Sequence, residues 1–134
     1  MKGQSSVEFV SIIGIALVLA APFVIESQDT MINLITDTEA AEFQASLNDM
    51  GDAATQVAAS GEKSSRTIEI TIPDNVENIY EQDRALIFEM DRGGSLQNFS
   101  QIFPATTNSN ITTDQGLKTV KIKFNSSELH LEQK

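Results

Sequence analysis

Residues 7–25 read VEFVSIIGIALVLAAPFVI, and this stretch decides the fold of the 134-residue chain. From Phe9 to Ile25 no residue is charged, so the run reaches the roughly 17 residues that a helix needs to cross a bilayer. A water-soluble core helix would show one polar face, whereas only Ser11 and Gly14 interrupt the apolar surface here. The stretch therefore predicts a transmembrane helix.

The apolar pattern continues beyond the charge-free run at helical spacing. Apolar residues recur at steps of three or four along one stripe, which Glu39 interrupts, and they are Ile32, Ile35, Phe43, Leu47, Met50, Ala54 and Val57. We expect one helix from about Ser6 to Ala59, with Gly61 as its stop signal and a kink at Pro22. The stripe from Ile32 to Val57 is expected to pack on the rest of the chain.

Beyond the helix the period of the pattern changes from 3.6 to 2. Alternating segments predict strands at Thr67–Ile72, Ala85–Met90 and Leu117–Phe124, with weaker strands near Leu96–Phe103 and Ser127–Leu131. In the last strong segment Val120, Ile122 and Phe124 are expected to point inward, and Lys121 and Lys123 outward. Four or five antiparallel strands would form a sheet with one apolar face, which the helical stripe would cover. The predicted fold class is α+β: a long N-terminal helix with an apolar first half, and a small C-terminal antiparallel head.

The charges are divided unevenly between these two parts. The chain holds 9 basic and 19 acidic residues, a net charge of −10. Residues 1–61 contain one basic and eight acidic residues, whereas residues 62–134 contain eight basic and eleven acidic residues. This balance argues against nucleic-acid binding, which needs a clustered basic face. We place the helix in 4–61, with its membrane or filament-core segment at 7–25, and the head in 62–134.

Residues that would carry chemistry are scarce. Without cysteine the chain has no disulfide, iron–sulfur or thiol chemistry, and one histidine, His130, near an end expected to fray, supports neither a triad nor a multi-histidine metal site. The polar segment 74–78 lacks the glycine and spacing of an EF-hand and is predicted to be a turn with solvated acids. We therefore expect no enzyme, and no catalytic, cofactor-binding or metal-binding residue.

Three Asn-x-Ser/Thr sequons lie in the head, a modest excess over chance for a chain rich in serine and threonine. Asn110, in the polar run 106–115, is expected to lie in a surface loop. Asn125 follows a strand, and Asn98 is expected to be partly buried. Glycosylation at these sites would mark the head as extracytoplasmic.

The N-terminal segment has two ordinary interpretations besides the one that follows. A secretory signal peptide would use Lys2 and the small residues Ala20 and Ala21, but Glu8 and the continuing helical pattern do not fit a discarded peptide. An uncleaved anchor holding a monomeric binding module at the membrane fits the apolar run as well.

The first residues are Met-Lys-Gly, then Gln4-Ser5-Ser6-Val7-Glu8-Phe9, then the apolar run. This combination, with its Gln-x-Ser-x-Glu motif, resembles the class III signal peptides of archaeal type IV pilins over roughly the first 25 residues. The resemblance implies a leader at 1–3 that prepilin peptidase removes between Gly3 and Gln4, so that the apolar helix stays on the mature chain. Gln4, where bacterial pilins carry an aromatic phenylalanine, favours the archaeal branch.

The resemblance also implies roles in assembly. Glu8 would meet the N-terminal amine of a neighbouring subunit, although an acid in the first helical turn at the membrane interface explains it too. Ser5 and Ser6 are candidate N-caps. Gly14 and nearby alanines would let helices approach closely, and Pro22 would shape the rod.

Taken together, the resemblance implies an extracellular filament subunit of an archaeal pilus, made as a membrane-anchored precursor and displayed at the cell surface for cell adhesion. Its expected partners are other copies in a helical filament, prepilin peptidase, the membrane before assembly, and the pilus assembly ATPase and platform protein. N-glycans would make it a glycoprotein. A minor or tip pilin and the monomeric membrane-anchored module remain the alternatives.

Overall fold

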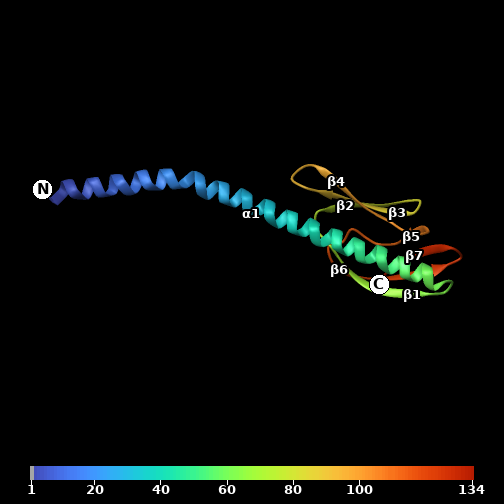
Figure 1. The fold of residues 1–134 in the computed structure, drawn as a ribbon. Coiled ribbons are helices and arrows are strands. Elements are labelled where there is room, and N and C mark those ends of the chain that lie inside the picture. Colours follow the sequence, from blue (N-terminus) through green and yellow to red (C-terminus); the bar gives the residue numbers. More distant parts are fainter. Residues whose placement is uncertain (1) are drawn as a thin grey trace. The chain divides into compact units, whose positions relative to one another are not determined.

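The computed structural model describes residues 2–134, so Met1 of the expected leader lies outside the described residues. The chain has one long N-terminal helix followed by strands in a mostly antiparallel arrangement, which confirms the α+β class (Figure 1). It divides into two compact units, Met1–Thr38 and Glu39–Lys134, and each is described by itself.

Helix α1 spans Lys2–Ser60 and continues through Pro22. The expected start near Ser6 is wrong: Ser5 and Ser6 lie inside the helix and do not cap it, because nothing between Lys2 and Val7 breaks the helical path. The expected end is confirmed. Gly61 follows with φ = 89°, a left-handed conformation that glycine adopts without steric cost, and the Ser64 hydroxyl donates to the carbonyl of Gly61 at 2.6 Å.

The strands form two sheets, so the single sheet of four or five strands that we expected is wrong. One sheet has the order β1-β6-β7-β5, with β1 at Ser65–Ile72, β6 at Gly116–Asn125, β7 at Glu128–Gln133 and β5 at Thr106–Ser109. The other is the antiparallel meander β2-β3-β4, with β2 at Val76–Gln82, β3 at Ala85–Asp91 and β4 at Leu96–Ile102. All pairings are antiparallel within the described residues except that of β5 with β7, which is parallel.

Two of the strands were not predicted from the sequence pattern. Strand β2 includes Glu77 and Asn78, which were expected in a turn, and strand β5 lies in the polar run expected to be a loop. Both are edge strands with mostly exposed side chains, so they lack the apolar alternation that marks a half-buried strand. Backbone pairing with a neighbour stabilises them instead.

The core lies within the unit 39–134 and joins α1 to both sheets. The ring of Phe43 packs edge-on against Phe88 of β3 at 5.1 Å and against Phe99 of β4 at 5.8 Å. On the other sheet, the Arg66 guanidinium of β1 donates to the Gln56 side chain of α1. The part of α1 from Ala40 to Val57 therefore packs on both sheets, which also contact each other where the Thr107 amide donates to the Asp83 carbonyl at 3.2 Å (Figure 1).

The expected burial pattern is confirmed for part of the chain. Most inward residues of the strong strands are buried, as are the helical residues from Phe43 onward: Phe43, Leu47, Met50, Ala54, Val57, Ile70, Ile72, Leu86, Phe88, Met90, Val120 and Ile122. Phe124, which was expected to point inward, is only partly buried, as is Ile68. The expected packing of Ile32 and Ile35 is wrong, because their side chains are 62% and 52% exposed. Burial on the stripe begins only after its polar interruption at Glu39.

Candidate functional site

The first functional feature is the apolar surface of α1 within the unit 1–38. An 18-residue window near the N-terminus is apolar enough, and its helix long enough, to cross a membrane, and none of that window is buried. Large apolar side chains are exposed all round it: Val7, Phe9, Val10, Ile12, Ile13, Ile15, Leu17, Val18, Leu19, Phe23, Val24 and Ile25, followed by Met31, Ile32, Leu34 and Ile35. Monomeric soluble proteins rarely expose so much contiguous apolar surface, and this segment is compatible with membrane anchoring.

Four hydroxyl groups on this segment bond to a backbone carbonyl one helical turn earlier. Ser11 donates to the carbonyl of Val7 at 2.8 Å, and Thr30 donates to that of Glu26 at 2.9 Å. Thr36 and Thr38 bond in the same i−4 manner. A hydroxyl without a partner would cost several kcal/mol in an apolar medium, so this bonding suits a helix that is surrounded by lipid or by other helices.

Gly14 and Pro22 both lie within the helix, and neither is explained by the described part of the fold. A Cβ atom at Gly14 would meet no other atom within 4 Å, and its backbone is not left-handed, so nothing in the described fold requires glycine there. Gly14 and Ala21 are seven residues apart and share one helix face, where small side chains permit a second helix to approach. Pro22 lacks an amide hydrogen and leaves the Val18 carbonyl without its helical donor.

The residues of the expected processing site and Glu8 all lie on the helix surface. Gln4 and Glu8 are exposed and four residues apart, so the expected cleavage point and the carboxylate share a face. Gly3 has no side-chain neighbour within 4 Å of where its Cβ would be. The structure brings Gln4 and Glu8 together through helical spacing alone.

A shallow hollow lies on the same unit, beside Phe23. Its volume is about 420 Å³, and it is lined by Ala20, Phe23, Val24, Ser27, Gln28 and Met31. The small residues Ala20 and Ser27 lie seven positions apart on one face and make the space between the larger side chains. Such a hollow can receive a side chain from another helix, as in knobs-into-holes packing.

The three sequon asparagines are all exposed. The expected partial burial of Asn98 is wrong, because its side chain points to the exposed face of the edge strand β4. Asn110 comes directly after β5 and accepts the Gln133 amide hydrogen at 2.6 Å through its side-chain oxygen. Asn125 is the last residue of β6.

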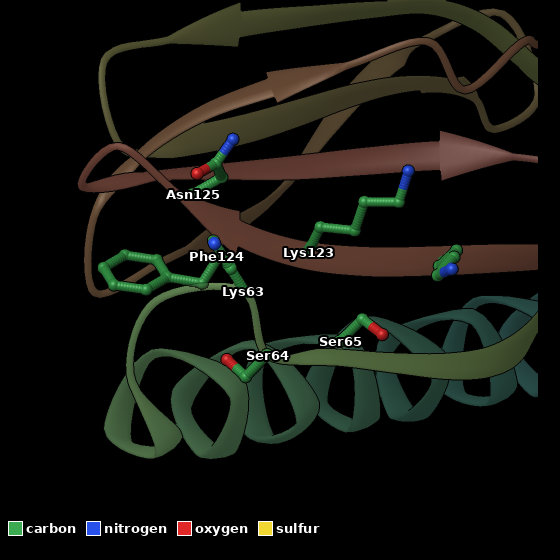
Figure 2. Close-up of a pocket in the computed structure, with 7 residues that line it drawn as sticks. Lys63, Ser64, Ser65, Lys123, Phe124 and Asn125 are labelled. Atoms are coloured by element: carbon green, nitrogen blue, oxygen red, sulfur yellow. The ribbon is translucent and has the colours of Figure 1, made fainter.

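The head carries a second feature, a pocket of about 260 Å³ between β1, β6 and the segment that follows α1. Figure 2 shows its lining, which includes three lysines and two serines: Lys63, Ser64, Ser65, Lys121, Lys123, Phe124 and Asn125. The alternation of β6 correctly placed Lys121 and Lys123 on the outer face, but no pattern in the sequence associates them with Lys63, some sixty residues earlier.

His130 occupies an ordered position that was not expected. It lies in β7, which has a strand on each side, so the fraying that we expected for this end is wrong. In the β6–β7 register it stands opposite Lys123. Among residues 2–134 there is no group of three or more histidine, aspartate or glutamate side chains able to hold a metal ion.

Comparisons with known proteins found no matching family model, no matching curated protein and no matching solved structure.

Proposed function

We propose that this chain is the structural subunit of an archaeal type IV pilus-like extracellular filament that assembles through α1. The observation that supports this most is the contrast within one helix. From Ala40 to Val57 α1 buries its apolar stripe in its own head, whereas from Val7 to Ile35 it exposes large apolar side chains on every face. A helix that is apolar all round is one that is surrounded, either by lipid or by like helices.

Assembly in this proposal exchanges lipid contacts for helix contacts. Lipid is about as apolar as leucine, so the hydrophobic effect adds little, and close packing has to supply the gain. Gly14 offers an open surface with no role in the isolated chain, and the hollow beside Phe23 offers a receptacle for a side chain. The heads, whose strands are mostly polar on the outside, would then lie on the outer surface of the filament.

Processing would come before assembly. In the proposal, prepilin peptidase cuts between Gly3 and Gln4, the apolar helix stays on the mature chain, and Glu8 pairs with the new amine of a neighbouring copy. A carboxylate among apolar side chains is costly unless it is paired or reaches water. Glu8 would therefore set the axial register of each arriving subunit.

The two alternative roles differ from that of a filament subunit in what surrounds α1. A minor or tip pilin would use the same helix surface at one end of the filament. A monomeric anchored module would leave Gly14 and the hollow beside Phe23 facing lipid. In both cases the chain would not form the body of a filament.

The test is expression of the full chain in an archaeal host that processes type IV pilins. We expect mass spectrometry of the mature chain to show an N-terminus at Gln4, and electron microscopy of sheared cells to show filaments built from this chain. Glu8→Ala and Glu8→Gln should be processed normally but yield few or no filaments, because the carboxylate is lost in both.

The control is Glu26→Gln, which removes one carboxylate from the same helix outside the charge-free run and should assemble normally. A mature start after Ala21 would establish secretion and overturn the proposal, and an intact Met1 without filaments would establish the anchored module. Filaments from Glu8→Gln at the parental yield would overturn the pairing of Glu8.

A further inference from the structure

The lysine pocket of the head does not follow from the filament proposal, because its lining belongs wholly to the unit 39–134 and includes no residue of the apolar helix segment. The register places Ser65, Lys123 and His130 in one row across the three strands, and Thr67, Lys121 and Glu132 in the next. Lys63 reaches the same place from the segment after α1 (Figure 2).

The lysine pocket concentrates positive charge in a chain that is acidic as a whole. The chain has a net charge of −10, yet three of its nine basic residues line one pocket of about 260 Å³. The Lys123 ammonium lies 2.6 Å from the Glu132 carboxylate. Within the described part of the chain no ion pair at contact distance is found for Lys63 or Lys121, although Lys121 lies opposite Glu132 in the β6–β7 register.

The lysines of the pocket also act on the neighbouring Glu132 carboxyl. The hydrogen bond from Lys123 holds the pKa of the Glu132 carboxyl below its usual range; desolvation opposes this effect, and the charges of Lys123, Lys121 and His130 act in the same direction as the hydrogen bond. The Glu132 carboxylate is thus stabilised by the cations of this face, and it offsets part of their positive charge.

The pocket is held in shape before any ligand arrives. The Lys63 amide donates to the Phe124 carbonyl at 2.9 Å, and the Phe124 amide donates to the Ser64 carbonyl at 3.0 Å. The Glu62 carboxylate accepts the amide hydrogens of Ser126 and Ser127 at 2.8 and 3.1 Å, which ties the segment after α1 to the β6–β7 turn. A preorganised site loses less entropy when it binds.

We propose that this pocket binds a small oxyanion: a carboxylate, sulfate or phosphate group, either free or carried by one acidic sugar residue. Lysine ammonium groups act as point charges toward such anions, and the Ser65 hydroxyl and the Asn125 amide add neutral donors. The volume of about 260 Å³ lies just below the usual 300–1,000 Å³ of drug-sized ligand sites, which leaves room for one small group.

The experiment uses the full chain, labelled with ¹⁵N, in micelles of an uncharged detergent. Sodium sulfate, sodium phosphate and sodium glucuronate are titrated separately, with glucose and sodium chloride at matched ionic strength as controls. We expect saturable amide shifts confined to the pocket residues with at least one of the three anions, and none with glucose. Binding of free sulfate or phosphate but not glucuronate indicates an inorganic ligand, and preferential glucuronate binding indicates an acidic sugar.

The variant Lys63→Gln/Lys121→Gln should weaken that binding about ten-fold, since each exposed ammonium contributes modestly. Lys118→Gln is the matched control, because Lys118 lies on β6 opposite Ile70 and faces away from the pocket. It should change the affinity by less than about two-fold. The proposal is overturned if the shifts track ionic strength as they do with chloride, or if Lys118→Gln weakens binding as much as the double variant. Neither result depends on filament formation.

Discussion

At the scale of single residues, the most informative contact is the one that Glu62 makes. Ser126 and Ser127 form the two-residue turn between β6 and β7 with φ = 54° and 65°, a left-handed conformation that usually selects asparagine and glycine. The Glu62 carboxylate accepts both of their amide hydrogens across more than sixty residues of sequence. A turn that is locally unfavourable is therefore supported by the segment that ends the helix.

The Glu132 carboxyl gives a prediction at this scale. Its pKa is lowered, first by the hydrogen bond from Lys123, so the ion pair stabilises the fold above the usual carboxyl pKa and this stabilisation is lost as the pH falls through the lowered value. We expect Lys123→Gln to return the Glu132 pKa toward its usual range. Carbon-detected NMR of the Glu132 carboxyl during an acid titration measures this, with Lys118→Gln as the control. An unchanged pKa in Lys123→Gln would exclude the ion pair.

At the scale of elements, α1 is one helix with two environments. In the unit 1–38 four of its hydroxyls bond to its own backbone, and its large apolar side chains are exposed. In the unit 39–134 a Cβ atom at Gly51 would meet the end of the Gln101 side chain of β4, a flexible group that can move away. Displacing this side chain would offset part of the roughly 1 kcal/mol that alanine gains over glycine in a helix.

This contact predicts an interaction between two substitutions. Gly51→Ala alone gains helix propensity but forces the Gln101 side chain away, so we expect little net change in unfolding free energy. In a Gln101→Ala background the same change should stabilise the chain by about 1 kcal/mol. Urea unfolding of the full chain in uncharged detergent, followed by far-ultraviolet circular dichroism, measures the four members of the cycle. Equal effects of Gly51→Ala in both backgrounds would contradict the contact.

At the scale of the whole molecule, leucine is exposed in one unit of the chain and buried in the other. Leu17 is 66% exposed, whereas Leu47 is fully buried between the helix and the sheets. Stability of the folded head is therefore carried by the second part of α1, and the first part is free to exchange one apolar surrounding for another.

We accordingly expect Leu47→Ala to lower the unfolding free energy of the head by about 2–5 kcal/mol, because it leaves a cavity in the core. Leu17→Ala should change it by less than about 0.5 kcal/mol. The loss of strand amide signals in ¹⁵N spectra of the full chain, followed with urea in uncharged detergent, compares the two. Similar destabilisation by both substitutions would show that the two units are not energetically separate.

The sequence by itself determined what local periodicity encodes. The apolar run up to Ile25, the helix end at Gly61 and the alternating strands β1, β3 and β6 are visible because a period of 3.6 or 2 records which side chains avoid water. The candidate assembly residues Glu8, Gly14 and Pro22 were also found from sequence, since each departs from an apolar helical pattern. Their proposed roles remain predictions.

Only the tertiary structure decided which parts of those patterns are covered. Ile32 and Phe43 are equally apolar and lie on one predicted stripe, yet one is exposed and the other buried, because burial depends on where the sheets are. The edge strands β2 and β5, the Glu62 contact and the pocket that joins Lys63 to Lys121 and Lys123 likewise depend on pairing between distant segments. Contacts of this kind produce no repeating pattern in a single sequence, since each partner is a polar residue that does not stand out from its neighbours in the chain.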